Sequence, residues 1–190
     1  MDKTALRTQL LARRRALGAP ELERSSRAVQ ARLAGLPAWR KAREVLAYMA
    51  FGGEVATTGL IEELWGRGAL VYVPRCRPEE PGQVDLACLT CFDQLRPGQY
   101  GIMEPDPAQC QWLDGCAPDL ALIPAVGFDR RGGRLGFGQG YYDRLLARPG
   151  FSETLLVGLA HSFQLVAALP QEPWDRPVHV IVTDKETVWP

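Results

Sequence analysis

The first part of the chain alternates apolar and charged residues at the spacing of amphipathic helices. Between Lys3 and Leu17, leucines recur among charged residues at positions 6, 10, 11 and 17, a spacing typical of one helical face. Gly18 follows and is a suitable end for this helix. Pro20 suits the first turn of a second helix, which we expect to run to Gly35. The chain is therefore expected to open with two helices.

Further along, short continuous apolar runs have the length of buried strands. In order, they are VLAYMAF (45–51), ALVYVP (69–74), DLACLTCF (85–92), DLALIPAV (119–126), TLLVGLA (154–160) and HVIVTD (179–184). Between the first two runs, Thr57 or Thr58 is placed to cap a helix through LIEELW. This helix is expected to end at Gly66 and Gly68.

Continuous apolar strands that alternate with helices are typical of a sheet covered on both faces. We therefore expect an α/β fold with three layers, α/β/α, and a mostly parallel open sheet of about six strands. A helix around Tyr141–Ala147 and a Pro/Gly-rich loop at 96–118 complete the expected elements. The chain shows no internal repeat, low-complexity tract or linker, which predicts a single domain over residues 1–190.

Composition and charge narrow the classes of function. The 190 residues are 46% hydrophobic and carry 22 basic and 22 acidic side chains, for a formal net charge of zero. A neutral chain has no overall field that attracts nucleic acid or an acidic membrane, although a local basic patch can still hold phosphates. No apolar run reaches the length of a membrane span, and the N-terminus is charged. A cytoplasmic monomer that binds small molecules is expected.

The five cysteines are Cys76, Cys88, Cys91, Cys110 and Cys116. An odd number without a secretory signal favours free thiols. Cys88 and Cys91 form a CxxC, which a redox pair or half of a zinc site would also show. However, the segment reads as extended, so residues three apart point to opposite faces, and no second CxxC or nearby histidine completes a site. Buried structural thiols are the favoured interpretation.

The stretch RLGFGQGYYDRLL (134–146) is the clearest candidate for chemistry. Its glycines, with the two before it, lie at positions 132, 133, 136, 138 and 140. Exposed backbone amides that lead into a helix N-terminus form an anion site, and Arg134, expected as an exposed loop charge, adds a cation suited to phosphate. The spacing matches neither a Walker A loop nor the dinucleotide fingerprint. A tight structural turn is the alternative.

The position of this loop supports a binding role. It follows the strand that ends near Val126, and ligands of open α/β sheets lie beyond the carboxyl ends of strands. Asp143, in the first turn of the helix, would complement the helix dipole or bind magnesium. Tyr141 and Tyr142 would be core aromatics or a stacking face for a heterocycle, and one of the two is expected to pack inward.

Other candidates are scattered along the chain. Glu54 follows the first strand and would face the same edge of the sheet. Lys3 and Arg7 lie one helical turn apart, so they could clamp a polyphosphate or simply form a solvated face. Asp175 could be a second magnesium ligand or a loop residue. The two histidines, His161 and His179, lack the context of a catalytic triad, so core or strand-edge roles are expected for both.

The segment FDRRGGRLGFGQGYYDRLL resembles the signature of the 5-formyltetrahydrofolate cyclo-ligase family, whose members are also called 5,10-methenyltetrahydrofolate synthetases. Other segments are similar to the family in the same order. They are KTALRTQLLARRRAL, YMAFGGEVATTGLIEELWGRG, YGIMEP, DLALIPAVGFD and GLAHSFQLVAALPQEPWDRPVHVIVT. The resemblance covers about Lys3 to Thr183. It implies a fold like that of phosphosugar isomerases and CoA-transferase domains.

The resemblance also implies a reaction. Family members close the ring of 5-formyltetrahydrofolate to 5,10-methenyltetrahydrofolate, with ATP and Mg²⁺, and release ADP and phosphate. The formyl oxygen attacks the γ-phosphate of ATP, the folate N10 then attacks the activated carbon, and phosphate leaves. Such catalysis rests on alignment and charge neutralisation more than on a protein nucleophile.

The resemblance assigns roles to matching positions of this sequence. The ATP contacts would be Lys3, Arg7, Arg134, Leu135, Gly136, Gly138, Gln139, Gly140, Tyr141 and Tyr142. The folate contacts would be Phe51, Glu54, Phe137, Gly138, Gln139, Gly140 and Tyr141. The Mg²⁺ ligands would be Asp143 and Asp175, and the catalytic residues Arg134 and Tyr142. Glu54 would accept hydrogen bonds from the donor edge of the pterin, and Tyr142 would lie nearest the formyl group.

Two positions depart from the family pattern. Gln139 stands where some members have lysine, which removes a cation, and Arg144 or Lys3 would have to compensate. Ala56 stands where members often have an acidic or polar residue, so one substrate contact would be absent. Two other functions remain open at this point: a non-catalytic protein that binds 5-formyltetrahydrofolate, and a phosphosugar-binding or isomerase module, for which no general base is evident.

Overall fold

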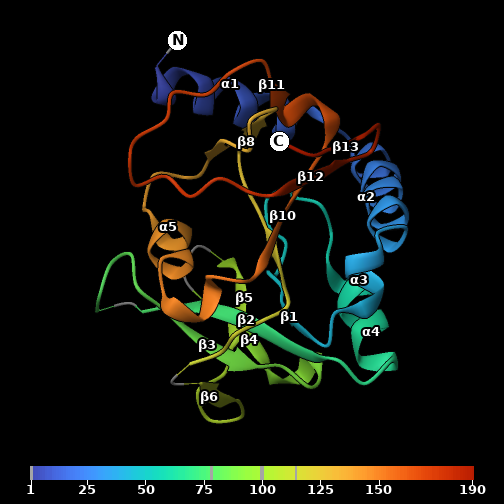
Figure 1. Ribbon diagram of the computed structural model, residues 1–190, viewed down its shortest axis with the longest axis vertical. Coiled ribbons are helices and arrows are strands. Elements are labelled where there is room, and N and C mark those ends of the chain that lie inside the picture. The colour runs from blue at the N-terminus through green and yellow to red at the C-terminus, as the bar shows by residue number, and fades with distance from the viewer. Residues whose placement is uncertain (1, 78, 99–100, 114) are drawn as a thin grey trace.

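The computed structural model describes residues 2–77, 79–98, 101–113 and 115–190, and the centre of the described chain is an eight-stranded sheet (Figure 1). Its strands follow the order β13-β12-β10-β7-β1-β2-β3-β6. Their bounds are β1 Glu44–Leu46, β2 Leu70–Cys76, β3 Val84–Cys88, β6 Gln111–Leu113, β7 Leu120–Ile123, β10 Leu155–Ala160, β12 Val180–Thr183 and β13 Thr187–Val188. The five consecutive strands from β12 to β2 pair in parallel, which confirms the mostly parallel sheet, although it has eight strands and not the expected six or so. The other three strands pair antiparallel.

The two predicted N-terminal helices are present. The described α-helices are α1 Lys3–Ala16, α2 Ala19–Ala34, α3 Pro37–Lys41, α4 Thr58–Gly66 and α5 Tyr141–Leu146. Helix α1 begins at Asp2, whose side chain accepts a hydrogen bond from the amide of Ala5 at 2.7 Å. Gly18 separates α1 from α2 by serving as the N-cap of the second helix. The short helix α3 was not expected from the sequence pattern.

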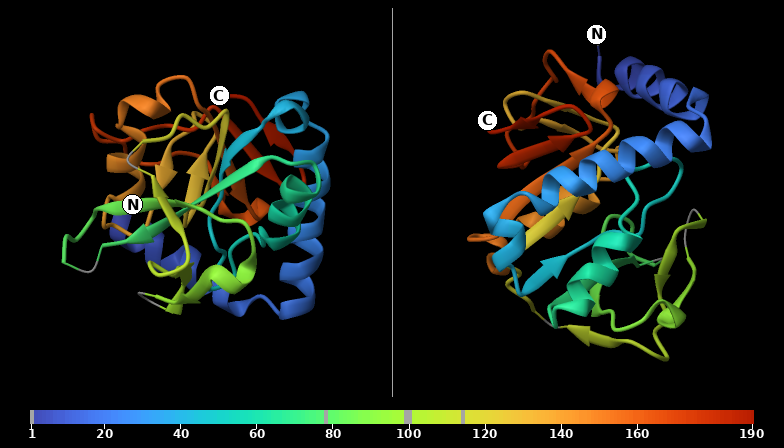
Figure 2. Two further views of the ribbon diagram at one scale, coloured as in Figure 1. Left: turned by 90° about the horizontal axis from the view of Figure 1, so that it is seen from below. Right: turned by 90° about the vertical axis from the view of Figure 1, so that its right-hand side faces the viewer.

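The sheet divides its side chains between two apolar clusters. On β7, Leu120 and Leu122 pack with α2, α3 and α4 in one cluster, whereas Ala121 and Ile123 pack with α5 in the other. Alternate residues of a strand point to opposite faces, so a fully apolar strand needs cover on both sides. Figure 1 shows α2, α3 and α4 on one side of β1 and β10 and α5 on the other, and Figure 2 shows α2 running along the sheet.

Several predicted boundaries were wrong. The strand expected at 45–51 pairs only as far as Leu46, and the strand expected at 85–92 pairs only as far as Cys88, where it runs antiparallel to β2. The loop expected at 96–118 contains β6 and also the hairpin of β4 (Leu95–Pro97) and β5 (Met103–Pro105). These strands are too short, and two of them too rich in proline, to show a clear period of two.

A second, small sheet lies next to the glycine-rich loop. It consists of β8 (Gly127–Asp129), β9 (Arg134–Leu135) and β11 (Leu165–Val166). Short 3₁₀ helices occur at Phe92–Gln94, Pro149–Phe151 and Ser162–Gln164. Among the described helices, none combines the length and the apolar character that crossing a membrane requires.

The central strand β7 predicts a test of the core. Leu122 is fully buried there, whereas Leu70 on β2 is 47% exposed. Leu122→Ala should lower the free energy of unfolding by about 2–5 kcal/mol through lost burial and a cavity, and Leu70→Ala should change it by less than about 1 kcal/mol. Urea denaturation followed by circular dichroism measures both values. Equal losses in the two variants would contradict this placement of the core.

Candidate functional site

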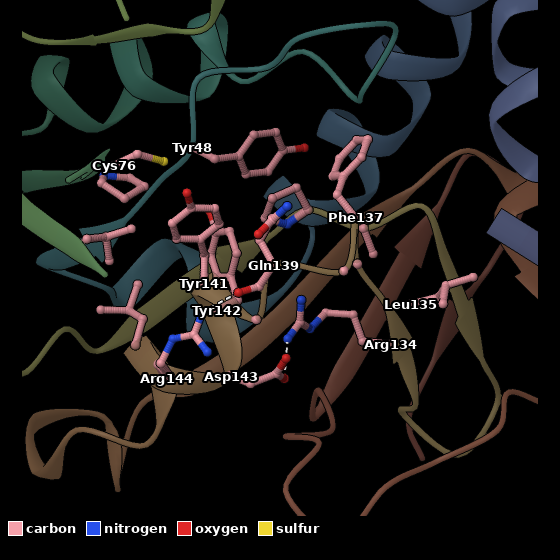
Figure 3. Close-up of a pocket in the computed structure, with 18 of the residues that line it drawn as sticks. Tyr48, Cys76, Arg134, Leu135, Phe137, Gln139, Tyr141, Tyr142, Asp143 and Arg144 are labelled. Carbon is pink, nitrogen blue, oxygen red and sulfur yellow. Dashed lines mark hydrogen bonds and ion pairs between the residues drawn. The ribbon is translucent and has the colours of Figure 1, made fainter. Parts of the chain in front are cut away.

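A cavity of about 870 Å³ lies at the edge of the sheet where β1 and β7 end (Figure 3). Tyr48 and Met49, just after β1, and Pro124 and Ala125, just after β7, form part of its wall. Helix α1, the β4–β5 hairpin and the glycine-rich loop supply other parts. Neighbouring parallel strands end at the same edge of a sheet, so loops that are distant in the sequence meet there.

Every residue that the sequence singled out for binding lines this cavity. They are Lys3, Arg7, Phe51, Glu54, Arg134, Leu135, Gly136, Phe137, Gly138, Gln139, Gly140, Tyr141, Tyr142, Asp143 and Asp175. Ala56 is absent from the described lining. Its amide donates to Ser26 Oγ at 3.1 Å and its carbonyl accepts from Gln30 Nε2 at 2.7 Å, so this position helps to hold α2.

The glycines serve two different purposes. Gly132 and Gly133 form the turn between β8 and β9, and a Cβ atom on Gly132 would lie only 2.4 Å from the carbonyl oxygen of Val178. Gly138 and Gly140 instead line the cavity with φ angles of 104° and 67°. Side chains rarely adopt such angles, so glycine is required there for the backbone path. The structural turn and the binding loop are therefore adjacent parts of one segment.

Two ion pairs lie across the cavity wall. Arg134 Nη2 is 2.5 Å from Asp143 Oδ1, and Lys3 Nζ is 2.8 Å from Asp175 Oδ2. Arg7 Nε donates to the carbonyl oxygen of Gly136 at 2.9 Å. The side chain of Arg134 is only 6% exposed, so the expectation of an exposed loop charge was wrong. Its Nε is buried and has no hydrogen-bond partner among the described residues.

The two acidic residues lie close together in space. The backbone N–H of Arg176, next to Asp175 in the chain, donates to Asp143 Oδ1 at 3.5 Å. Burial by itself raises the pKa of Asp175, but the hydrogen bond and charge of Lys3 and the amide of Glu172 outweigh it and hold this pKa below its usual range. Asp175 is therefore an ionised carboxylate at neutral pH.

These carboxylates fit a magnesium ion that arrives with phosphates. The described residues contain no group of three or more histidine, cysteine or acidic side chains that would hold a metal by themselves. Mg²⁺ commonly binds proteins through one or two carboxylates and takes its other ligands from water and phosphate. Asp143 and Asp175 match that donor set.

Glu54 lies on a tight turn that also lines the cavity. Gly52 and Gly53 precede it with φ angles of 55° and 81°, which glycine permits. Glu54 Oε2 accepts a hydrogen bond from the amide of Phe51 at 3.3 Å, while Oε1 is buried without a hydrogen-bond partner in the described chain. Burial raises the pKa of Glu54 to about 7, although the charge of Arg14 opposes this shift. The carboxyl group is thus poised between its two protonation states near neutral pH.

Aromatic side chains also line the cavity. The rings of Phe51 and Phe137 lie 5.3 Å apart at 34°, and the guanidinium of Arg134 lies 5.6 Å from the ring centre of Tyr142. Tyr141 and Tyr142 both line the cavity and both pack in part against the second apolar cluster (Figure 3). Burial, and to a lesser extent the charge of Glu54, raises the pKa of Tyr142, so its hydroxyl stays protonated.

Sequence reasoning missed part of the lining. Cys76 and Glu104 belong to it, as does the exposed Trp174, whereas Arg144, which the sequence named as a compensating cation, also lines the cavity. Glu104 is buried on β5, and its Oε1 accepts a hydrogen bond from the amide of Cys76 at 3.4 Å. Burial, together with the charge of Glu104, raises the pKa of the Cys76 thiol to about 11. The strand signal of β5 was too short to draw attention to Glu104.

All five cysteines are free thiols, but the expectation of buried thiols holds for Cys110 alone. Cys76, Cys88 and Cys116 are half-buried, and Cys91, the second cysteine of the CxxC, is exposed. The two histidines have the structural roles expected of them. His161 is buried between Ser25 and the carbonyl oxygen of Gly53, and His179 lies at a strand edge, where its Nδ1 accepts from the amide of Leu156 at 3.1 Å.

Known proteins resemble this chain over nearly its whole length. It is 35% identical over 177 residues to 5-formyltetrahydrofolate cyclo-ligase of Escherichia coli K12, which covers 93% of this chain and 97% of that protein. The Haemophilus influenzae protein of the same name is 32% identical and covers 93% of this chain and 95% of that protein.

Solved structures agree with the sequence matches. The solution structure of Aquifex aeolicus 5,10-methenyltetrahydrofolate synthetase has a TM-score of 0.85 and 36% identity, covering 100% of this chain and 93% of that one. The synthetase from Mycoplasma pneumoniae has a TM-score of 0.71 and 28% identity, and the match covers 97% of this chain and 99% of that one. Residues 1–184 match the profile of the 5-formyltetrahydrofolate cyclo-ligase family. The chain therefore belongs to the 5-formyltetrahydrofolate cyclo-ligase family.

Proposed function

We propose that this protein closes the ring of 5-formyltetrahydrofolate to give 5,10-methenyltetrahydrofolate, using ATP and Mg²⁺ and releasing ADP and phosphate. One observation carries the proposal beyond family membership. One cavity is lined both by a cationic glycine loop with the carboxylates of Asp143 and Asp175 and by the buried carboxylate of Glu54 with the rings of Phe51 and Phe137. The first group suits a metal-bound triphosphate and is called the phosphate end below, and the second suits a flat heterocycle with hydrogen-bond donors and is called the folate end.

At the phosphate end, the cations would exchange partners when ATP binds. Arg134 and Lys3 now pair with Asp143 and Asp175, and the triphosphate would take over these two cations. Planar Arg134, with its unpartnered Nε, is suited to phosphate oxygens. The two released carboxylates would then hold Mg²⁺, whose charge would neutralise the phosphate oxygens during transfer.

The departure at Gln139 has a local counterpart. The guanidinium of Arg144 donates to the carbonyl oxygen of Gln139 and to that of Gly82, the latter at 2.7 Å. A cation therefore lies beside the position where some family members carry lysine. Arg144 would supply positive charge to the γ-phosphate region in its place.

At the folate end, Glu54 would accept hydrogen bonds from the pterin ring. Glu54 lines the cavity together with Phe51 and Phe137, and its buried Oε1 has no hydrogen-bond partner among the described residues, so a flat donor edge that reached it would satisfy this acceptor. Tyr142 would lie closest to the formyl group, and its hydroxyl would remain protonated to act as a hydrogen-bond donor.

The chemistry then proceeds in two steps that the cavity would align. The formyl oxygen attacks the γ-phosphorus and displaces ADP, which leaves a phosphorylated, electron-poor carbon. The folate N10 attacks that carbon, and the C–O bond breaks as phosphate departs and takes up the proton that N10 loses. Both steps need correct placement and shielding of phosphate charge, and neither needs a protein nucleophile.

Three further features belong to this proposal. The whole chain would form one domain, arranged in three layers like phosphosugar isomerases and CoA-transferase domains. It would act as a cytoplasmic monomer without nucleic acid or membrane partners. A folate-binding protein without activity is less well supported, because it would not need a second end of the cavity built from cations and glycine amides.

The direct test is an assay for product. Purified protein should generate the absorbance of 5,10-methenyltetrahydrofolate only when 5-formyltetrahydrofolate, ATP and Mg²⁺ are all present, and excess EDTA should abolish the signal because Asp143 and Asp175 alone cannot replace the metal. Tight binding of the folate without product would favour the binding protein. If the protein neither bound the folate nor formed the product, the result would favour the sugar-phosphate alternative.

Arg134 offers a sharper test of the phosphate end. Arg134→Gln should lower kcat by roughly 100-fold or more, because a preorganised donor to the transferring phosphoryl group is lost. Arg130→Gln is the matched control, since Arg130 is exposed on the same hairpin and pairs with Glu186 away from the cavity. Product absorbance and circular dichroism report activity and folding. Full activity of a folded Arg134→Gln variant would remove Arg134 from the mechanism.

Glu54 predicts a pH dependence. Its pKa of about 7 means that the accepting carboxylate is populated above this pH. The value of kcat/KM for 5-formyltetrahydrofolate should therefore decrease as the pH falls through about 7. Glu54→Gln should raise KM for the folate, leave KM for ATP nearly unchanged and remove this limb of the profile. Glu62→Gln, on the exposed side of α4, should retain the wild-type profile. An unaltered limb in Glu54→Gln would assign the titration to another group.

A further inference from the structure

Helix α1 carries a row of cations, of which the first two line the cavity. At about 100° per residue, Lys3, Arg7 and Arg14 fall within about 40° of one another around the helix axis. Lys3 contacts Asp175 and Arg7 contacts the glycine loop. Arg14, the last of the row, is 4% exposed and plays no part in the proposed reaction so far. A buried arginine requires a reason, because removing its charge from water is costly.

Arg14 lies against both walls of the folate end. Its guanidinium carbon is 5.6 Å from the ring centre of Phe137, and its Nη1 is 3.9 Å from Glu54 Oε1. The Arg14 side chain also packs against the turn that precedes Glu54, since a Cβ atom added to Gly53 would lie 3.3 Å from Arg14 Cγ. The residue therefore joins α1 to the Glu54 turn and to the glycine loop.

The contact between Arg14 and Glu54 is a charge pair without a hydrogen bond. At 3.9 Å the two atoms are beyond hydrogen-bond distance, and both Arg14 Nη1 and Glu54 Oε1 are buried without partners among the described residues. Buried polar atoms without partners are uncommon in folded proteins and call for an explanation. Glu54 belongs to the cavity lining whereas Arg14 does not, so a ligand in the cavity would meet the carboxylate, with its unpartnered acceptor, before the guanidinium.

We propose that Arg14 is a positioning residue for the folate ring, which holds the Glu54 carboxylate toward the cavity and in its charged, accepting form. This inference rests on the proposed function, because it assumes that Glu54 receives the donor edge of a reduced pterin. Arg14 itself need not touch the ligand. Its contact with Phe137 would also keep the aromatic wall at a fixed distance from the carboxylate.

The charges around Glu54 single out Arg14. Besides burial, the groups that act on Glu54 are Arg14 from α1 and the amide of Phe51, and both favour the ionised form. Tyr48, after β1, and Tyr142, on α5, also face it, and both are kept neutral by burial. Arg14 thus supplies the cation that opposes the burial of this carboxylate. Without it, Glu54 would be protonated over a wider range of pH.

The experiment compares pH profiles. Arg14→Met keeps the length of the side chain and removes its charge, and Arg14→Lys keeps the charge. The profile of kcat/KM for 5-formyltetrahydrofolate should shift to higher pH in Arg14→Met, with about a tenfold loss at neutral pH that recovers in alkali. KM for ATP should stay near the wild-type value, and Arg14→Lys should restore most of the wild-type profile. Arg15→Met, exposed on the same helix, is the matched control.

A purely structural role gives a different result. A loss of equal size at every pH, or an equal rise in both KM values, would overturn the proposal. In a Glu54→Gln background, Arg14→Met should cause no further change in the profile, and an additional shift would also contradict it. If circular dichroism shows that Arg14→Met does not fold, Arg14→Lys decides the question. A wild-type pH profile in Arg14→Lys supports the role of charge, and a loss of activity that is independent of pH opposes it.

Failure of the reaction itself can be distinguished. A wild-type protein that makes no methenyl product overturns the proposed function and, with it, the role of Arg14 toward this substrate. An active wild-type enzyme with an unchanged Arg14→Met profile overturns only the positioning role. Carbon-13 NMR titration of the Glu54 carboxyl group, without ligand, provides an independent reading, since its pKa should rise in Arg14→Met and stay unchanged in Arg15→Met.

Discussion

The parallel sheet must be covered on both faces, and this constraint determines where the cavity forms. The strands from β12 to β2 are apolar on both sides, so helices occupy each face and leave the carboxyl ends of the strands as the place where polar loops gather. The segments after β1 and β7 meet at that edge, although more than seventy residues separate them in the sequence. Glu54 and Arg134 line one cavity for this reason.

Within the cavity, charge is balanced by pairing in the protein itself. Arg134 with Asp143 and Lys3 with Asp175 form close pairs, and Arg14 with Glu54 forms a looser one. A triphosphate with its metal carries the same two kinds of charge, so its binding would exchange partners without leaving either sign unbalanced. This internal pairing would allow a chain of zero formal charge to bind the highly anionic molecules of the proposed reaction.

The sequence predicted the parallel core and most of the residues that line the cavity. It predicted the strand boundaries and the burial of individual side chains less well. Long apolar runs and the glycine string are strong local signals, and the resemblance to a family placed Glu54, Asp143 and Asp175 together. Arg14 was missed because its side chain is buried by a turn that is distant in the sequence. Helical spacing alone does not distinguish a buried arginine from a solvated one. Glu104 was missed because β5 spans only Met103–Pro105, too short for a pattern to register.

The thiol of Cys76 has a consequence for the lifetime of a reactive species. Its pKa of about 11, raised by burial and by the neighbouring Glu104, leaves almost no thiolate at neutral pH. A protonated thiol is a poor nucleophile. In the proposed reaction, the Cys76 thiol would therefore not compete with the folate N10 for the electron-poor carbon. The enzyme would thus avoid forming a covalent adduct with a side chain of its own cavity.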